Sequence, residues 1–582
     1  MLPHLVEGQL TRIVSSPGFA GSPRMVRFLE FVVREVLRGN ASELKEIVIG
    51  SAVFDRDSNY DPRLDPIVRV EARRLRSKLE TYYEGAGADD EIVIELPRGS
   101  YAPVIRQRSE AAVQPLSQPA ASIAILPFRN LHADNDGAYF TDGLAEELIN
   151  ALTRVPGLRV VAWNTASQFR EQDADIDAIR RHLNVGYVLR GSLRKTGQRL
   201  RIAAQLVETA TGHYLWSETW DRQIYDVFAI QEQIAEAIAD ALKLRILDPP
   251  NTRAARHVCV DAWQICLKGR FHARDRNPDG LRRSVMCFEQ AIAVCAESAS
   301  AWAGLADSYT LLAEYELEEP AKALPKARAA AEKALALDPK SEEAHASLGL
   351  IYCVHDWRWD EGARMFERAI TLNPGYVNAR HWYAMDHLAM QGNFAEARKQ
   401  IQIATELDPL SNLILEQHAF LHTLERNYDA AIDHLRSMLD AEPSFYKAWT
   451  SLGRALIQKG QYSEAIEALK NGLQLAGDLP NIFGALGQAY GLAGDIASAR
   501  GVLARLKDLG ENRPLRFTCF ALVHLGLREK DQALNYLECA AAAREAGVAG
   551  LYVHPVWDPL RSEPRFRSLL EQTGFGSLLT VS

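Results

Sequence analysis

The sequence predicts a multidomain protein that joins α/β parts to an all-α part, and three observations carry this prediction. Residues 65–104 read as a basic helix followed at once by a β-hairpin. Residues 122–247 alternate strand and helix patterns, and residues 259–582 carry an alanine that recurs every 34 residues. A chain of 582 residues is long enough for three or more domains.

The expected domain boundaries follow from two stretches without apolar periodicity. Residues 109–121 are rich in Pro, Ser, Gln and Ala, and residues 248–258 contain two prolines, Pro249 and Pro250, that stop a helix. We therefore expect three domains separated by these linkers, at residues 1–108, 122–247 and 259–582.

The first domain should place a basic helix next to a hairpin. We expect helices over Ser22–Arg38 and Leu44–Val53, then a helix after Asp65, and a hairpin with Pro97-Arg98-Gly99 at its tip. The third helix has an apolar stripe at helical spacing, formed by Val68, Ala72, Leu75, Leu79 and Tyr82. In the hairpin, Ile92, Ile94 and Leu96 should face one side, and Val93 and Glu95 the other. This order is the layout of a winged helix-turn-helix, which lays its helix in the major groove of DNA.

Arginine dominates the flanks of this helix, and arginine suits guanine edges and phosphates. The expected DNA contacts are five helix residues and one hairpin residue: Arg69, Arg73, Arg74, Arg76, Lys78 and Arg98. Residues 1–108 contain 16 Lys and Arg against 16 Asp and Glu, so any attraction to DNA is local. The alternative is a solvated helix face in a domain that serves protein contacts.

The same segment resembles the OmpR-type winged-helix family. VRVEARRLRSKL contains the LRxKL pattern at Leu75, Arg76, Lys78 and Leu79, and IELPRGSY matches the wing turn at Arg98, Gly99 and Tyr101. The resemblance implies DNA binding. This chain departs from the family at its start, where helical sequence replaces a leading β-sheet.

The second domain reads as a small α/β unit. We expect strands at Ser122–Phe128, Leu158–Ala162, Tyr187–Arg194, Leu200–Val207 and Tyr214–Glu218, and helices at Ala138–Arg154, Ile176–Leu183 and Tyr225–Leu244. The stretches SIAILPFRNL and YVLRGSLRKTGQRLRIAAQLVETATGHYLW resemble the TolB N-terminal-like domain of bacterial multidomain regulators. The resemblance implies a sensing or assembly module. Trp163, Trp216 and Trp220 fit either a ligand pocket or, more simply, core packing.

The C-terminal half has the period of the tetratricopeptide repeat. The in-phase alanines are Ala329, Ala363, Ala397, Ala431, Ala465, Ala499 and Ala533. A large apolar residue follows four positions later at Ile401, Leu435, Leu469, Leu503 and Leu537. Weaker copies lie around residues 259–297 and after Arg513, and HPVWDPLRSEPRFRSLLEQTGF suits a cap. Such an α-solenoid presents a groove for a protein or peptide partner, or serves as an empty scaffold.

Catalytic and metal-binding signals are missing from the sequence. There is no P-loop, G-x-G-x-x-G, H-E-x-x-H or G-x-S-x-G, so we expect no enzyme and no cofactor. Asp55, Asp57, Asp61 and Asp65 are spaced like a metal loop but lack its Gly and Glu, so we expect no metal. The seven cysteines form no C-x-x-C, which favours a reducing cytosol over a disulfide framework.

The function expected from the sequence is that of a soluble bacterial-type transcriptional regulator. Its partners would be duplex DNA and a protein held by the repeats, in the cytoplasm and without a membrane, since no apolar run approaches the ~20 residues of a membrane span. The alternative is a cytosolic interaction scaffold that does not bind DNA. A homo-oligomer is compatible with both.

Overall fold

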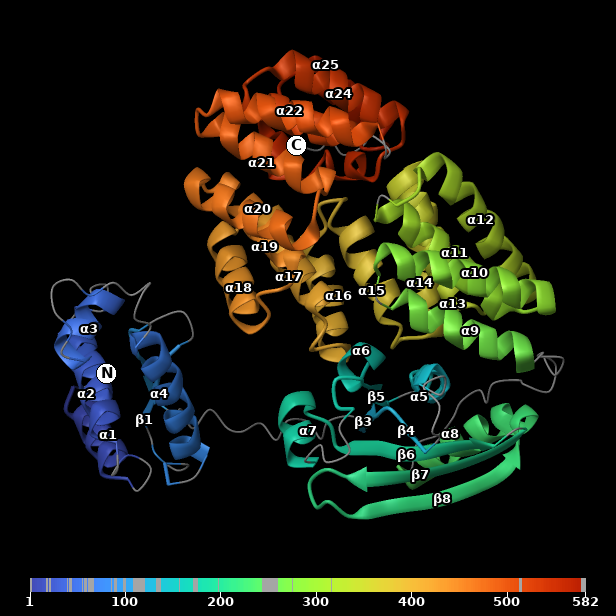
Figure 1. Cartoon of the computed structure of the whole chain (residues 1–582), viewed down its shortest axis with the longest axis horizontal. Coiled ribbons are helices and arrows are strands. Elements are labelled where there is room, and N and C mark those ends of the chain that lie inside the picture. The colour runs from blue at the N-terminus through green and yellow to red at the C-terminus, as the bar shows by residue number, and fades with distance from the viewer. Residues whose placement is uncertain are drawn as a thin grey trace. The chain divides into compact units, whose positions relative to one another are not determined.

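The chain forms two compact units, Met1–Gln118 and Pro119–Ser582, which are described separately (Figure 1). The computed structural model describes residues 3–576 except 17–18, 20–21, 39, 41–43, 55, 57–59, 61–66, 85, 88–89, 91, 98–100, 108–120, 132–137, 156, 171–175, 197, 243–259, 275, 316 and 512–515. Most of the linker residues 109–121 and all of 248–258 therefore lie outside the described residues, as do the four spaced aspartates at positions 55, 57, 61 and 65.

The first unit packs four helices against a two-stranded sheet (Figure 1). Its elements are α1 (Pro3–Ser15), α2 (Pro23–Leu37), α3 (Glu46–Phe54), α4 (Ile67–Glu84), β1 (Ile92–Glu95) and β2 (Val104–Gln107). The strands pair antiparallel, with Ile92 opposite Gln107. Every expected helix and strand of this region is present, and α1 is the helical start that the sequence indicated.

Apolar periodicity explains how these elements assemble. Helix α2 begins with Pro23 in its first turn, where a missing N–H costs nothing, and buries Met25, Phe28, Leu29, Val32 and Val33. The predicted stripe of α4 is buried in the same core together with Ile92, Ile94 and Leu96. Val93 was expected to face outward but is also buried, so both faces of β1 are covered at that position.

The second unit begins with a mixed sheet in the order β5-β3-β6-β7-β8 (Figure 1). Its strands are β3 (Ser122–Ile125), β4 (Arg129–Asn130), β5 (Arg159–Val160), β6 (Tyr187–Thr196), β7 (Arg199–Glu208) and β8 (Tyr214–Gln223). Its helices are α5 (Ala138–Leu152), α6 (Trp163–Ala166), α7 (Ile176–Leu183), the 3-10 turn η3 (Ile224–Asp226) and α8 (Val227–Ala241). Strands β3, β5 and β6 run parallel, and β6, β7 and β8 form an antiparallel meander.

The short elements α6 and β4 were not expected from the sequence. Four residues of helix and two of strand are too short to show a period, so only the tertiary structure defines them. The tryptophans belong to the packing: Trp163 and Trp220 are buried in the core under the sheet, and Trp216 packs against that core with its ring 5.7 Å from Trp220. The packing interpretation of these residues is therefore the correct one.

Pairs of antiparallel helices make up the rest of the second unit (Figure 1). They are α9 (Val260–Ala273), α10 (Pro278–Val294), α11 (Ala299–Glu314), α12 (Pro320–Leu337), α13 (Glu342–Leu350), α14 (Trp359–Leu372), α15 (Val377–Trp382), α16 (Phe394–Leu407), α17 (Asn412–Leu424), α18 (Tyr428–Ala441), α19 (Tyr446–Gln458), α20 (Tyr462–Ala476), α21 (Pro480–Leu492), α22 (Ile496–Gly510), α23 (Phe517–Gly526) and α24 (Lys530–Ala542). Short π and 3-10 segments follow at η4 (Ile351–Asp356), η5 (Tyr383–Leu388), η6 (Ala546–Gly550) and η7 (Pro555–Leu560), and the chain closes with α25 (Pro564–Gln572).

From the fourth helix pair, α15 and α16, onward, the alanines spaced 34 residues apart occupy the same position in the second helix of each pair. In the earlier pairs they do not. Each alanine from Ala397 to Ala533 in the series is fully buried at the third residue after the start of its helix. Ala363 is half-buried. Its neighbour Gly362 lies at the third residue after the start of α14 instead, where an added Cβ would lie 2.2 Å from the Cys353 sulfur. Ala329 is exposed, and the buried Ala323 lies at the third residue after the start of α12 instead. The 34-residue spacing therefore predicts the wrong residue for the buried position of α12 and of α14, where Ala323 and Gly362 lie in place of Ala329 and Ala363.

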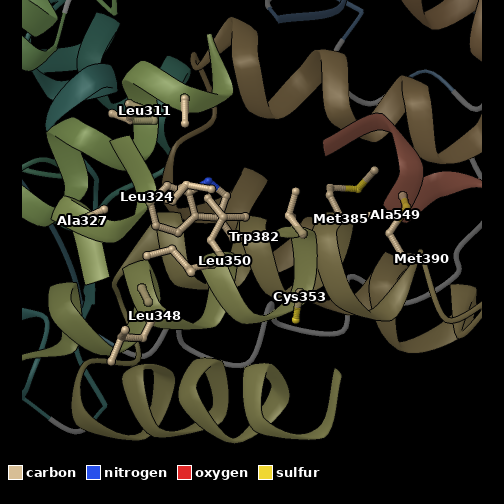
Figure 2. Packing of buried hydrophobic residues seen from close by; sticks show 14 of the residues in the cluster. Leu311, Leu324, Ala327, Leu348, Leu350, Cys353, Trp382, Met385, Met390 and Ala549 are labelled. Carbon is tan, nitrogen blue, oxygen red and sulfur yellow. The ribbon is translucent and has the colours of Figure 1, made fainter. Parts of the chain in front are cut away.

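The repeat array does not end as an open chain of neighbours, because its C-terminal segment packs back on the middle repeats. The ring of Trp359 lies 4.9 Å from that of Phe575 and its indole N–H donates to the Thr573 carbonyl at 2.9 Å. Figure 2 shows Met385 and Met390 beside Ala549 in one buried cluster. The predicted cap is thus present, and it covers repeats far away in the sequence.

Among the described residues no helix is both long and apolar enough to cross a bilayer. The same residues contain no cluster of three or more His, Cys, Asp or Glu side chains arranged to hold a metal ion.

Candidate functional site

Helix α4 is fixed at its N-terminal end by a contact that joins three elements. The Arg69 guanidinium donates to a carboxylate oxygen of Glu46 in α3 at 2.8 Å, and the Tyr101 hydroxyl donates to the same oxygen at 2.6 Å. Burial would raise the pKa of Glu46, but the hydrogen bonds from Arg69 and Tyr101 outweigh it and lower that pKa. Arg69 itself stays 57% exposed, so the contact positions it without hiding it.

Arg76 links α4 to the end of strand β1. Its guanidinium donates to the carbonyl of Leu96 at 3.0 Å and to that of Pro97 at 3.0 Å. These contacts hold the start of the hairpin loop against the helix. Arg76 therefore has a structural task in addition to the DNA contact predicted for it.

The other predicted contact residues differ in their surroundings. Arg74 is 65% exposed and forms an ion pair with Glu71 one turn earlier in α4. The Lys78 ammonium lies 5.6 Å from the centre of the Phe19 ring. The side chain of Arg73 and the whole of Arg98 lie outside the part of the chain that the structure describes. Four of the predicted residues, Arg69, Arg74, Arg76 and Lys78, are thus described, and all four lie on α4.

A polar cluster that the sequence did not reveal anchors the other end of α4. The Tyr82 hydroxyl donates to Asp90 at 2.7 Å, and the Gln9 amide of α1 donates to the same carboxylate oxygen at 2.6 Å. Burial and then the hydrogen bond to Asp90 raise the pKa of Tyr82 to about 12. The Tyr83 hydroxyl accepts from the Ile94 N–H at 2.8 Å. Their spacing of up to 81 residues explains why no local pattern indicated them.

In the second unit, the α/β part and the repeats are joined by arginine–carboxylate contacts. Arg270 of α9 pairs with Glu147 of α5 at 2.5 Å and with Glu343 of α13 at 3.3 Å. Arg274 pairs with Asp142 at 3.3 Å, and the Asp142 side chain is almost completely buried. These three carboxylates and two arginines make a continuous charged contact between α5 and the first repeats.

A second contact joins α6 to the end of α16. The Asp408 carboxylate accepts from the Thr165 N–H at 3.1 Å and from the Thr165 hydroxyl at 2.7 Å, and the Asn164 amide donates to it at 3.1 Å. The Ala162 N–H donates to the Leu407 carbonyl at 2.8 Å. Burial raises the pKa of Asp408 although these hydrogen bonds oppose it. The N-terminus of α6, which favours negative charge, thus receives a carboxylate from the repeats.

Two segments of the chain match known protein families. Residues 119–237 match the family described as "HilA/YgeH-like transcriptional regulator, second domain". Residues 423–478 match the tetratricopeptide repeat family. The chain thus carries a HilA-like regulator domain and tetratricopeptide repeats.

Individual relatives cover only parts of the chain. A protein of Rhizobium meliloti named "Putative adenylate cyclase 3" is 37% identical over 163 residues, 28% of each protein. Transcriptional regulator HilA of Salmonella typhimurium is 23% identical over 304 residues, 51% of this chain and 52% of HilA. A solved tetratricopeptide repeat protein of Parabacteroides merdae is 12% identical with a TM-score of 0.31, covering 54% of this chain and 98% of that protein. The chain spans about half or less of the length of the two curated relatives.

Proposed function

We propose that this chain is a transcriptional regulator that binds duplex DNA through residues 1–108 and a protein partner through its repeats. The observation that carries the proposal is the match of residues 119–237 to the second domain of HilA-like regulators. A compact unit with a basic helix and a hairpin precedes that segment in the sequence.

In this proposal the first unit acts as a winged helix of the OmpR type. Helix α4 lies in the major groove, and Arg69, Arg73, Arg74 and Lys78 contact bases or phosphates. The hairpin loop with Arg98 contacts the backbone beside the groove. Arg76 acts differently, because its hydrogen bonds to Leu96 and Pro97 set the position of that loop.

The α/β part serves as a sensing or assembly module of the TolB N-terminal-like type. Its support is the pair of contacts at Arg270 and Asp408, which tie the module to the repeats at two separate places. A conformational change in the α/β part would then alter the repeats, and a change in the repeats would alter the α/β part.

The competing function is an interaction scaffold without DNA binding. The observation that favours it is the balance of 16 basic and 16 acidic residues in residues 1–108, because non-specific DNA binding depends on positive charge. Both functions keep the repeats as a partner-binding array.

Gel retardation of mixed-sequence duplexes by the full chain separates the two. A regulator retards DNA. The logarithm of its binding constant should fall linearly with the logarithm of the salt concentration, with a slope of about −0.9 for each phosphate neutralised. Changing Arg69 and Arg74 together to Ala should weaken binding at least tenfold, since two cations are lost. The matched control is Arg34→Ala, which removes a similarly exposed arginine with a one-turn ion pair from α2.

No retardation, or a salt dependence that stays flat, contradicts the regulator. Weaker binding by the Arg34→Ala protein to the same degree would show that charge anywhere on the unit matters, and the assignment of α4 as the reading helix would fail.

Three further properties follow from the regulator proposal. It works without catalysis or a cofactor, so purified protein with ATP or GTP and a divalent metal should form no cyclic nucleotide, although one relative bears a cyclase name. It acts in the bacterial cytoplasm, where the chromosome is. It binds DNA either as a monomer or as a homo-oligomer, and sedimentation of the complex decides between them.

A further inference from the structure

The antiparallel strands β6, β7 and β8 carry a group of arginines on one face of their sheet (Figure 1). Residues paired across neighbouring strands share a face, and side chains alternate between faces along each strand. One face is buried in the core with α5 and α8, through Leu193, Leu200 and Ile202. On the other face the register places Arg194 opposite Arg201. We call the arginines of this second face the arginine face: Arg129 of β4, Arg190 and Arg194 of β6, and Arg199 and Arg201 of β7.

Positive charge on the arginine face is only partly balanced. Among the described residues of β4, β6, β7 and β8, Asp221 is the one carboxylate whose register places it on this face. It pairs with Arg199 at 3.0 Å and also lies opposite Arg201. Exposed Arg129, Arg194 and Arg201 have no hydrogen-bond, ion-pair or ring partner among the described residues. The face therefore holds more positive charge than its own carboxylate neutralises.

The position of Arg194 opposite Arg201 is unfavourable for the fold by itself. Like charges that lie directly opposite one another on antiparallel strands destabilise a sheet. A general excess of basic residues does not explain the two arginines, because the chain has 66 Lys and Arg against 75 Asp and Glu and a net charge of −9. Neither side chain makes a polar contact within the described part of the fold. The two arginines therefore gain a physical role when an anion lies on the face.

The residues between the arginines narrow the kind of anion that fits. The neighbouring positions of the same face are polar or small: Ser192, Thr196, Ala203, Gln205, Ser217 and Thr219. The core of a protein–protein interface is more apolar than this, whereas protein–DNA interfaces are polar and strongly positive. Arg190, whose guanidinium carbon lies 5.2 Å from the centre of the exposed Tyr214 ring, continues the positive charge along β6. Since the guanidinium fork also matches two phosphate oxygens, a phosphate backbone fits this face better than an acidic protein does.

We propose that the arginine face binds backbone phosphates of duplex DNA and forms a second contact surface outside residues 1–108. The proposal rests on the DNA-binding part of the proposed function and adds a place where the second unit touches the same duplex. Because phosphate contacts carry no sequence information directly, the face raises the affinity for every sequence alike. Residues 109–121, which lie between the first domain and the α/β part in the sequence, can extend to at most ~45 Å. One turn of duplex is only ~35 Å long, so both units can reach one DNA molecule.

The test measures DNA retardation at several salt concentrations by the full chain and by a double variant, Arg194→Gln with Arg201→Gln. This Gln double variant loses two phosphate contacts. The slope of the logarithm of the binding constant against the logarithm of the salt concentration should therefore become shallower by about 1.8, at about 0.9 for each contact. The affinity for unrelated duplex sequences should fall to the same extent, since phosphates are common to all of them.

Two control variants isolate the arginine face. Arg194→Lys with Arg201→Lys keeps both charges and should keep the slope. Arg222→Gln with Arg282→Gln removes two exposed arginines from the opposite face of β8 and from α10, and should bind like the unchanged protein. Thermal unfolding of every variant shows whether it is folded, and the melting temperature of the Gln double variant should not fall, because the repulsion between like charges is relieved. If that variant does not fold, Arg129→Gln tests the same face from β4, with a slope change of about 0.9.

An unchanged slope in the Gln double variant rejects the arginine face and leaves DNA binding by α4 standing. An equal change in the variant of Arg222 and Arg282 rejects it too, because charge anywhere on the second unit would then count. A full chain that retards no DNA removes the inference and the DNA-binding part of the proposed function together. A slope that changes in the Gln double variant but not in Arg69→Ala with Arg74→Ala supports the arginine face and overturns α4 as the reading helix. Loss of poly-glutamate binding by the Gln double variant, with unchanged DNA retardation, would assign the arginines to an acidic protein instead.

Discussion

Residues of the same type on one helix make different contacts in this chain, and the sequence pattern does not distinguish them. Arg76 matches a DNA-contact pattern in the sequence, yet its guanidinium donates to two backbone carbonyls at the end of β1. Exposed Arg74, two residues earlier, forms a local ion pair with Glu71. The difference arises because the helix turns Arg76 toward the hairpin and Arg74 away from it.

Replacing Arg76 with Met should therefore destabilise the first unit. Two carbonyls lose a charged donor, which costs roughly 1–2 kcal/mol. Urea unfolding of residues 1–118, a compact unit with its own core, measures the loss. Arg34→Met is the control, and its effect should stay within ~0.5 kcal/mol as for other exposed ion pairs. Equal effects for the two would show that the contact to Leu96 and Pro97 adds nothing.

His554 should make the stability of the repeats depend on pH. Burial first, and then Arg454, Arg426 and Arg561, lower its pKa to about 3, against ~6.5 in an unfolded chain. Below pH 6.5 the His554 ring binds a proton in the unfolded state but stays neutral in the folded state. The contribution of His554 to the free energy of unfolding is therefore complete above pH 6.5. It is lost as the pH falls toward 3, by at most about 1.4 kcal/mol per pH unit.

The matched variant for this prediction is His554→Asn. The His554 Nδ1 accepts from the Val556 N–H at 3.2 Å, and Asn keeps an acceptor at this capping position but does not titrate. Between pH 7 and 5 the variant should lose about 2 kcal/mol less than the unchanged protein. His213→Asn in the exposed β7–β8 turn is the control. An unchanged pH slope in His554→Asn would contradict the burial of a neutral imidazole.

At the scale of elements, small residues decide how closely the repeat helices approach. Ala465 of α20 is fully buried, and an added Cβ at Gly453 of α19 would meet Leu469 at 2.5 Å. Residues of this size recur because two helices cross there with backbone close to side chain. The one-residue shift to Gly362 in α14 keeps the same close contact with a different residue.

Ala465→Leu should destabilise the repeats by ~1–3 kcal/mol, the usual cost of overpacking. The control is Ala329→Leu, because Ala329 is exposed on α12 although it shares the 34-residue spacing. Its effect should stay within ~0.5 kcal/mol. Thermal unfolding of the full chain compares the two. Similar losses of stability in the two variants would mean that the 34-residue spacing, and not burial, identifies the residues at which two helices pack closely.

At the scale of the whole second unit, the array is closed by its C-terminal segment. The His355 ring and the Arg544 carbonyl form a 3.2 Å contact across 189 residues, and the Trp359 ring lies 4.9 Å from the Phe575 ring. A solenoid in which each repeat touches only its neighbours would confine damage to one place. This closure predicts that damage at the cap reaches the middle repeats.

Phe575→Ala tests that closure. Phe575 is fully buried, and truncating a buried Phe costs about 3–5 kcal/mol. Hydrogen exchange should accelerate in α25 and also in α14, more than 200 residues earlier, because Trp359 loses its neighbour. Phe575→Leu, which fills most of the space, is the control. Faster exchange confined to residues after 546 would show that the cap and α14 are energetically independent.

The sequence by itself determined the elements whose signal is local. The α4 stripe, the hairpin, strands β6, β7 and β8 and the helix pairs from Phe394 onward all have a period or a turn that neighbouring residues create. Only the tertiary structure decided the rest. It placed Arg76 against the hairpin and put Ala323 and Gly362 at the buried positions where the 34-residue spacing predicts Ala329 and Ala363. It also joined Asp408 to Thr165 and brought Lys447 to Tyr315. The physical reason is that these contacts join residues tens to hundreds of positions apart, where no local period exists and only the packing of whole elements brings side chains together.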